Sequence, residues 1–299
     1  MARTKAGDRA DRSGQMLAGR YRIERLVGIG AMGSIWAVRD VASGLEAVAK
    51  VHEAALASAS DPMARERFLR EAIALASVRH PNVVSLLEVG QTEAGEPFLI
   101  MERLVGEPLD ERLARGRPTV NEVLTIGIEL LGGLEAVHAA GVLHRDVKPE
   151  NVFLARVEGG TLVKLLDFGL ARGLGWPSGK ITRVGVAVGT PGYMSREQAR
   201  GRRDLDARTD LYSVGVVLYE LLSARRPFEG LTPTDVMVRS CTEPPVPLSR
   251  YRPDLPPVLT SVIMRALACD RRERFDDACR TSTFAARHRR ARATSTTTS

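Results

Sequence analysis

The chain has 299 residues, of which 44% are hydrophobic and 5% aromatic, and these values suit one large globular domain or two lobes. Its three cysteines show no metal-ligand spacing, so we expect a reducing, cytoplasmic location and no disulfide framework. No apolar run reaches about 18 residues and the N-terminal segment has no apolar signal core, so we expect neither a membrane span nor a secretory signal in this sequence.

The net charge of +7 is carried almost entirely by arginine, because only five of the 43 basic residues are lysines. The basic residues are spread along the chain, which favours solvated surface charge over nucleic-acid binding. A compact ammonium and a planar guanidinium are not interchangeable. The lysines that the chain retains, Lys50 and Lys148 above all, are therefore candidate functional residues.

In chain order, residues 1–16 are charged, with few large apolar side chains, and we expect this leader to be disordered. Residues 21–51 alternate apolar and polar side chains in strand-like stretches that a glycine cluster and a turn interrupt. A helix then opens at Asp61-Pro62, and two strands bracket residues 90–96. The first lobe, about residues 17–102, is therefore predicted to be an antiparallel sheet with one main helix.

A hinge over residues 102–106 is expected to lead into a larger, mainly helical lobe at about 107–280. The tail at 281–299 is rich in Arg and Thr, and we expect it to be disordered. The whole chain is thus predicted to be an α+β protein. The strongest helical patterns of the second lobe cover residues 119–140, 209–223 and 259–267.

The first motif is Gly28-Ile-Gly-Ala-Met-Gly33, in which glycines follow the pattern G-x-G-x-x-G. A dinucleotide-binding turn has the same spacing but runs directly into a helix, whereas Ser34-Ile35 opens a strand. A glycine-rich hairpin of this kind lets backbone N–H groups approach phosphate oxygens. Lys50 follows on the next strand between apolar neighbours. Glu71, on the helix after it, is the candidate counter-charge, with Glu53 and Glu66 as alternatives.

The strongest signal is His144-Arg-Asp146-Val-Lys148-Pro-Glu-Asn151. In this order Asp146 can accept the hydrogen bond and proton of a hydroxyl, and Lys148 can neutralise a migrating phosphoryl group. Asn151 offers a carbonyl oxygen to a hard cation such as Mg²⁺. Asp167-Phe-Gly169 comes 16 residues after Asn151, so a hairpin would return Asp167 beside it as a second metal ligand.

Further along, Gly189-Thr-Pro-Gly-Tyr-Met-Ser-Arg-Glu197 closes the segment after Asp167. Asp210 opens an apolar helix, where a helix N-cap is the simplest interpretation. Arg274 is a candidate ion-pair partner for a buried acid such as Glu197, although a solvated arginine is the default.

Together with His80-Pro-Asn, these ordered motifs resemble the eukaryotic-like Ser/Thr protein kinases of bacteria over about residues 19–275. The resemblance implies a bilobal protein-kinase-like fold that uses ATP with Mg²⁺ or Mn²⁺. It also implies protein substrates with Ser or Thr, autophosphorylation in bacterial signalling, and a homodimer for phosphorylation in trans. Two alternatives remain open: a pseudokinase that serves as a binding module, and a small-molecule kinase of related fold.

By resemblance, Lys50 would hold the α- and β-phosphates and pair with Glu71, Asp146 would be the catalytic acid–base, and Asn151 and Asp167 would bind the metal. Leu75, Leu86, His144 and Phe168 would form a hydrophobic spine. Thr182 is the best phosphosite candidate, and Thr190 is the second. The implied nucleotide-binding residues are Gly28, Ile29, Gly30, Ala31, Met32, Gly33, Ser34, Ile35, Val48, Lys50, Met101, Glu102, Leu104, Asn151 and Asp167.

The sequence departs from the family pattern at two positions near these motifs. Val48 stands where a small alanine is usual above adenine, so we expect a narrower nucleotide pocket. Arg196 replaces the proline that usually precedes the glutamate at 197, and we expect this loop to be looser and to dock substrates less well.

Overall fold

The computed structural model describes residues 11–30, 33–52, 62–168 and 190–278. The chain divides into two compact units, and each unit is made of two separate stretches of the sequence. The first unit contains the residues up to 76 and residues 85–103. The second unit contains residues 77–84 and the residues from 104 onwards.

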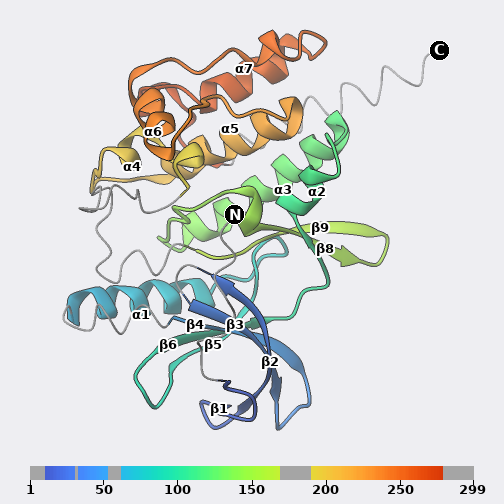
Figure 1. The fold of residues 1–299 in the computed structure, drawn as a ribbon, viewed down its shortest axis with the longest axis vertical. Coiled ribbons are helices and arrows are strands. Elements are labelled where there is room, and N and C mark those ends of the chain that lie inside the picture. The colour runs from blue at the N-terminus through green and yellow to red at the C-terminus, as the bar shows by residue number, and fades with distance from the viewer. Residues whose placement is uncertain (1–10, 31–32, 53–61, 169–189, 279–299) are drawn as a thin grey trace. The chain divides into compact units, whose positions relative to one another are not determined.

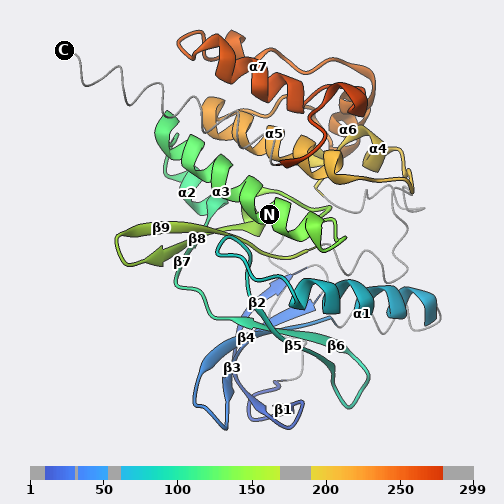
Figure 2. The ribbon, with the colours of Figure 1, turned by 180° about the vertical axis from the view of Figure 1, so that it is seen from behind.

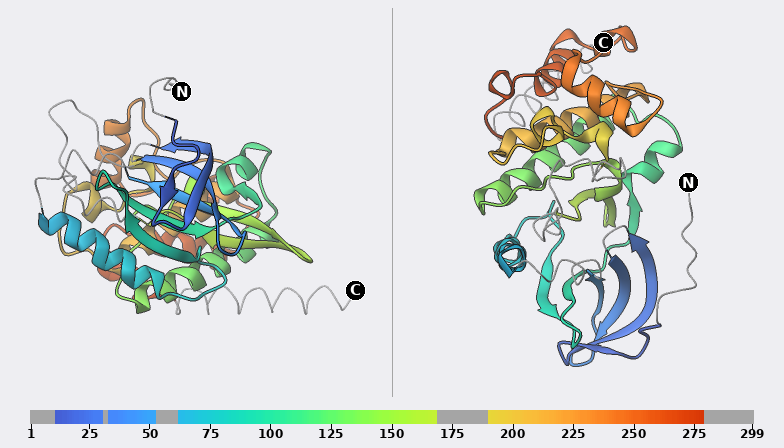
Figure 3. Two further views of the ribbon diagram at one scale, coloured as in Figure 1. Left: turned by 90° about the horizontal axis from the view of Figure 1, so that it is seen from below. Right: turned by 60° about the vertical axis from the view of Figure 1, so that its left-hand side comes forward.

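The first unit is built on a six-stranded antiparallel sheet with the strand order β1-β2-β3-β4-β6-β5. The helix α1 (Pro62–Ala76) packs against β5, and the right-hand view of Figure 3 looks nearly along this helix. This is the sheet with one main helix that the sequence predicts. The strands are β1 (Met16–Leu17), β2 (Tyr21–Gly30), β3 (Gly33–Asp40), β4 (Glu46–Val51), β5 (Leu86–Gln91) and β6 (Pro97–Glu102).

Alternation along the strands forms the core of this unit, because every second side chain of a strand points to the same face. Trp36 and Val38 on β3, Ala49 and Val51 on β4, and Phe98 and Ile100 on β6 are all buried. On α1, the buried residues Phe68, Ala72 and Leu75 follow the helical spacing i, i+4, i+7.

Residues 11–16 are part of this unit, although the sequence suggests disorder. Arg12 makes two hydrogen bonds, of 2.6 and 2.8 Å, with the carboxylate of Glu96, and Gly14 donates its N–H to the carbonyl of Ile23 at 2.8 Å. Residues 11–16 thus belong to the folded first unit and not to a disordered leader. So short a segment shows no periodicity that would have revealed it, and residues 1–10 lie outside the described residues.

The second unit is mainly helical, with a small antiparallel sheet in the order β7-β8-β9 (Figures 1 and 2). Among the described residues, no helix is long and apolar enough to cross a membrane. The elements are β7 (Gly106–Pro108), α2 (Leu109–Ala114), α3 (Val120–Ala139), β8 (Val152–Val157), β9 (Gly160–Leu165), α4 (Arg196–Ala199), α5 (Ala207–Ser223), α6 (Pro233–Thr242) and α7 (Pro257–Ala266), with short 3-10 turns at Pro149–Asn151, Pro191–Tyr193, Leu248–Arg250 and Arg271–Glu273.

The three strongest helical patterns are confirmed as α3, α5 and α7. The side chain of Thr119 caps α3 by accepting the N–H of Glu122 at 3.2 Å, and Gly141 follows its end with a positive φ of 73°. The helix α5 is buried along most of its length and packs against both α3 and α7. It therefore forms the centre of the second unit.

Residues 77–84 belong to the second unit, whereas the sequence places them in the first lobe at 17–102. Asn82 explains the difference. Its side-chain Nδ2 donates to the carbonyl of Val163 at 2.9 Å, and its own carbonyl accepts the N–H of Leu165 at 2.9 Å. Hydrogen bonds to β9 at this long sequence separation are not visible in a local pattern.

Candidate functional site

Residues 144–151 lie between α3 and β8 and bring together two predicted catalytic residues, Asp146 and Lys148, and the predicted metal ligand Asn151. The Nδ2 of Asn151 donates to the main-chain oxygen of Asp146 at 2.8 Å and to its Oδ2 at 3.1 Å. The Nζ of Lys148 lies 3.5 Å from the same Oδ2. These two bonds use the Asn151 Nδ2 as donor, and the amide Oδ1 is an oxygen of the kind that Mg²⁺ prefers as a ligand.

His144 links this loop to the strand that leads to Asp167. Its Nε2 lies 2.8 Å from the carbonyl oxygen of Leu166, and its ring packs on Phe168 with the centroids 4.7 Å apart. The imidazole is fully buried, and this burial lowers the pKa of His144. His144 therefore stays neutral at physiological pH and acts here as a structural contact.

Asp210 binds the backbone at the start of residues 144–151, which we call the catalytic loop because they carry the predicted acid–base Asp146. Its Oδ2 accepts the N–H of His144 at 2.9 Å, and its Oδ1 accepts the N–H of Arg145 at 2.7 Å. Arg145 adopts a positive φ of 63°, which costs free energy in a residue other than glycine. The N-cap interpretation of Asp210 is wrong, since Asp206 caps α5 by accepting the N–H of Arg208.

His138 was not among the predicted site residues, yet its Nε2 lies 2.8 Å from the Oδ2 of Asp210. Burial by itself would raise the pKa of Asp210, but the hydrogen bond and charge of His138, together with the N–H of His144, bring that pKa below its ordinary value. His138 lies near the end of α3 in the run Val137-His-Ala, where no local pattern distinguishes it from a core residue.

Thr190 lies beside the catalytic loop, because Lys148 Nζ donates to its Oγ1 at 3.1 Å. The 3-10 turn Pro191–Tyr193 follows, and the Tyr193 N–H donates back to the Thr190 carbonyl at 3.0 Å. The other phosphosite candidate, Thr182, lies outside the described residues.

The helix α4 begins with a complete capping box. The Ser195 side chain accepts the N–H of Gln198, and the Gln198 side chain accepts the N–H of Ser195. Gln198 also donates from Nε2 to the carbonyl of Arg145 at 2.8 Å. This helix start, which we expected to be looser without proline, is therefore fixed by hydrogen bonds to the catalytic loop.

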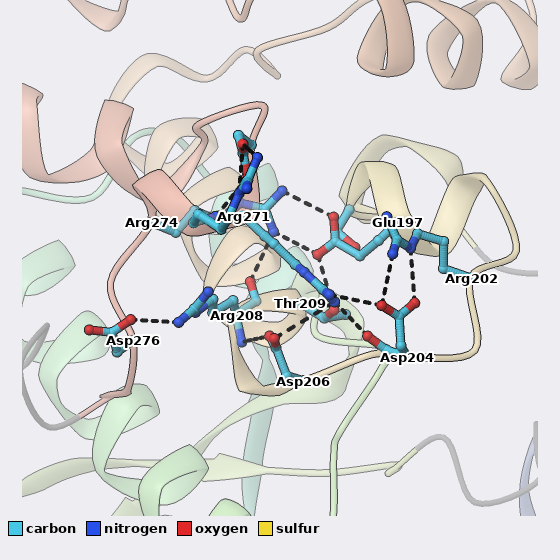
Figure 4. A network of polar contacts seen from close by, with 12 residues as sticks. Glu197, Arg202, Asp204, Asp206, Arg208, Thr209, Arg271, Arg274 and Asp276 are labelled. Carbon is cyan, nitrogen blue, oxygen red and sulfur yellow. Dashed lines mark hydrogen bonds and ion pairs between the residues drawn. The ribbon is translucent and has the colours of Figure 1, made fainter.

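Glu197 and Arg274 form the ion pair that the sequence suggests (Figure 4). Arg274 Nη1 lies 2.7 Å from Oε1, and Nη2 lies 3.1 Å from Oε2. Burial alone would raise the pKa of Glu197, but Arg274 brings it below the ordinary value. Figure 4 shows that more exposed pairs surround it, namely Arg208 with Asp276 and Arg271 with Asp204.

Asp167 comes directly after β9 and Leu166, and it has a positive φ of 52°. The N–H of Leu166 donates to the main-chain oxygen of Asn151 at 2.9 Å, so the two predicted metal ligands are anchored to one another through the backbone. No cluster of three or more His, Cys, Asp or Glu residues suited to a metal occurs in the described ranges.

In the first unit, the hairpin of β2 and β3 carries the glycine motif, and Gly30 pairs with Gly33. A Cβ on Gly33 would lie 1.9 Å from the carbonyl oxygen of Val51, so only glycine fits there. Around Gly28 nothing lies within 4 Å of such an atom. Ala31 and Met32 lie outside the described residues.

The remaining predicted nucleotide residues lie on neighbouring strands. Lys50 on β4 is half-buried and stands opposite Ile35 and Leu99, and Val48 stands opposite Met101. Glu102 ends β6, where its carboxylate accepts the N–H of Ser85 at 2.8 Å.

Two further predicted residues, Glu71 and Leu104, lie outside these strands. Glu71 is half-buried on α1, in the same unit as Lys50, and its pairing with Lys50 stays a prediction. Leu104 is half-buried at the start of the second unit.

Residues 21–280 match a family model described as "Protein kinase domain". The chain is 41% identical over 262 residues to the Serine/threonine-protein kinase pkn3 of Myxococcus xanthus, covering 85% of this chain and 47% of that protein. It is 37% identical over 257 residues to the Serine/threonine-protein kinase PknA of Mycobacterium tuberculosis, covering 84% of this chain and 57% of that protein. It thus spans about half the length of these curated relatives.

Among solved structures, the chain is similar to the PknI kinase domain of Mycobacterium tuberculosis, with a TM-score of 0.74 and 29% identity. That match covers 93% of this chain and 99% of the PknI chain.

Proposed function

The chain belongs to the protein kinase domain family, and from this membership we propose that it transfers the γ-phosphoryl group of ATP to Ser or Thr hydroxyls of proteins. The cluster of Asp146, Lys148 and Asn151, with Thr190 hydrogen-bonded to Lys148, is the observation that carries the proposal. One loop would thus supply a carboxylate that accepts the hydroxyl proton (Asp146), a cation (Lys148) and a metal ligand (Asn151).

In the second unit, Asp146 would orient the substrate hydroxyl and accept its proton as the bond to phosphorus forms. Lys148 would neutralise charge on the phosphoryl group, and its hydrogen bond to Thr190 fixes where its ammonium lies. Asn151 and Asp167 would hold Mg²⁺ or Mn²⁺, which when bound supplies charge neutralisation at the phosphates.

In the first unit, the Gly28–Gly33 hairpin, with Ser34 and Ile35 after it, would cover the phosphates. Lys50 would contact the α- and β-phosphates with Glu71 as its counter-charge. Val48, Met101 and Glu102 would be the adenine-binding residues of this unit, and Leu104, at the start of the second unit, is a further proposed nucleotide-binding residue. These assignments rest on the family resemblance and on two observations. The carbonyl oxygen of Val51 leaves no room for a side chain at Gly33, and Lys50 is half-buried.

The test is phosphate incorporation from labelled ATP into a generic protein substrate, with Asp146→Asn as the inactive variant. Asp146→Asn should lower the transfer rate by roughly 10² to 10⁴, because it removes the proton acceptor while keeping the main-chain contact to Asn151. Glu158→Gln is the matched control, since it removes an exposed carboxylate in the turn between β8 and β9. Equal rates for Asp146→Asn and the unaltered chain would exclude Asp146 from the reaction.

The same assay separates the alternatives. A pseudokinase would bind nucleotide but transfer no phosphate. A small-molecule kinase would phosphorylate an aminoglycoside and leave the protein substrate unmodified.

We also propose autophosphorylation at Thr182 as part of a signalling role. The arginine that precedes Asp146, Arg145, is typical of the kinases in which a phosphate orders the activation loop. Mass spectrometry of the active chain should find phosphate on Thr182, and Thr182→Ala should lower activity. An active chain with unmodified Thr182 would contradict this. Transfer onto an Asp146→Asn chain by the active chain would show that the reaction occurs in trans, as a homodimer predicts.

A further inference from the structure

Arg196 and Arg200 connect α4 to the C-terminal end of α6. The Nη2 of Arg196 donates to the carbonyl of Glu243, the residue that follows α6. The Nη2 of Arg200 donates to the carbonyl of Cys241 at 3.1 Å. Two guanidinium groups, one from the first residue of α4 and one from the residue that follows its last, thus bind the same end of α6, and we call this pair of contacts the arginine tether.

The chemistry of a helix end explains why arginines suit this position. The last four carbonyls of a helix have no partner within it and carry the negative end of its dipole. Cys241 contributes one of these carbonyls to α6, whereas the carbonyl of Arg239 is already bonded to the N–H of Glu243 at 2.8 Å. The tether therefore satisfies a carbonyl that the helix leaves open and supplies positive charge where the dipole favours it.

The tether leads to the proposed site for the substrate hydroxyl. The helix α6 packs against both α4 and the turn Pro191–Tyr193. That turn follows Thr190, which is bonded to Lys148. Lys148 also lies 3.5 Å from Asp146, so a hydroxyl held at Asp146 would lie near Thr190 and near the turn against which α6 packs.

We propose that Arg196 and Arg200 are positioning residues for the protein substrate, acting by fixing α6 against α4 and the Pro191–Tyr193 turn. This inference rests on the proposed phosphotransfer to proteins. It assigns Arg196 a role different from the proline that it replaces, because a proline would stiffen the start of α4 but has no side chain that could reach α6.

The experiment measures KM for a folded protein substrate, KM for ATP and kcat in the single variants Arg196→Ala and Arg200→Ala and in the double variant. KM for the protein should rise roughly three-fold for each single change and about ten-fold for the double change, as expected for hydrogen bonds with a charged donor at a partly exposed surface. KM for ATP and kcat should stay within two-fold. Arg203→Ala is the matched control, since Arg203 is exposed and no hydrogen bond joins it to another part of the described chain.

Two further variants distinguish the tether from a general effect on α4. Arg196→Lys keeps a donor and should restore part of the affinity. Arg196→Pro keeps a good helix start, because Ser195 has the extended backbone that a following proline requires (φ −67°, ψ 159°), but it removes the donor. It should behave like Arg196→Ala. If Arg196→Pro matches the unaltered chain, stiffness of α4 is what matters and the tether is refuted.

Amide hydrogen exchange provides a readout that does not depend on activity. Loss of the tether should accelerate exchange in the last turn of α6 and at the N–H of Tyr193, which is bonded to the Thr190 carbonyl. An unaltered chain that transfers no phosphate would contradict the proposed function, while exchange would still decide the tether. Unchanged exchange in the double variant, or a loss of kcat without a change in KM, would overturn the inference.

Discussion

Replacing Arg274 by Leu should destabilise the second unit by about 3–5 kcal/mol, the range measured when one partner of a buried ion pair is removed. The side chain of Arg274 is 0% exposed and that of Glu197 is 6% exposed. Besides its two bonds to Glu197, the guanidinium donates to the carbonyls of Ala268 at 2.9 Å and Arg208 at 3.1 Å. The variant loses all four bonds, while the Glu197 carboxylate keeps the hydrogen bond from the Thr209 hydroxyl at 3.1 Å, which carries no compensating charge.

The deficit should depend on pH in a defined direction. In the unaltered chain the pKa of Glu197 is below its ordinary value, so the pair stabilises the fold above the unfolded pKa, and this stability is lost as pH falls through the folded pKa. Without Arg274, burial dominates and raises the pKa of Glu197, so the variant is penalised only where the carboxylate is ionised. The difference between the two chains should therefore be largest near neutral pH and shrink towards pH 4.

Urea unfolding followed by far-ultraviolet circular dichroism measures this deficit, because most of the helices belong to the second unit. The double variant Glu197→Gln with Arg274→Met should lose less stability than Arg274→Leu alone, because no buried charge is left without a partner. A deficit under 1 kcal/mol at pH 7, or one that is the same at pH 7 and pH 5, would refute this reasoning.

Two other changes follow from the geometry. Gly33→Ala would place a Cβ 1.9 Å from the Val51 oxygen, and it should lower the free energy of unfolding by about 1–3 kcal/mol and weaken ATP binding. Gly28→Ala is the control, because a Cβ at Gly28 meets no atom within 4 Å. Equal ATP affinities of the two variants would contradict this prediction. His138→Leu would remove the hydrogen bond to the buried Asp210 and should cost about 1–3 kcal/mol in urea unfolding, with partial recovery in His138→Gln, whose amide can still donate; a cost near zero would show that the backbone N–H groups alone hold Asp210.

Sequence patterns predicted the elements whose signal is local. The alternation around Trp36 and Val38, the helical repeat of α3 and the apolar run of α5 each follow from a period that the chain repeats over many residues. The order of the motifs also predicted which residues would gather around Asp146, because all of them lie within one eight-residue loop.

Apart from the Glu197–Arg274 pair, which the family motifs suggest, contacts between distant segments were not predictable in this way. His138 and Asp210 are separated by 72 residues, and nothing near either marks them as partners. The sequence indicates only that Arg196 replaces a proline, whereas in the structure its side chain contacts Glu243, which lies 47 residues later in the sequence. Such pairings depend on the tertiary path of the chain, which a local period does not encode.

Residues 77–84 belong to the second unit although most of that unit follows much later in the sequence, and this has a consequence for synthesis on the ribosome. Asn82 emerges early, yet its partner Val163 follows 81 residues later. At about 5–20 residues per second, this segment waits roughly 4–16 seconds for the strand to which it bonds. During that interval Val83 and Val84, buried in the finished protein, lack the strand β9, with which they pair at Leu165. The nascent chain thus carries a short apolar stretch that a chaperone has time to bind, and neither unit can be completed before the other has begun.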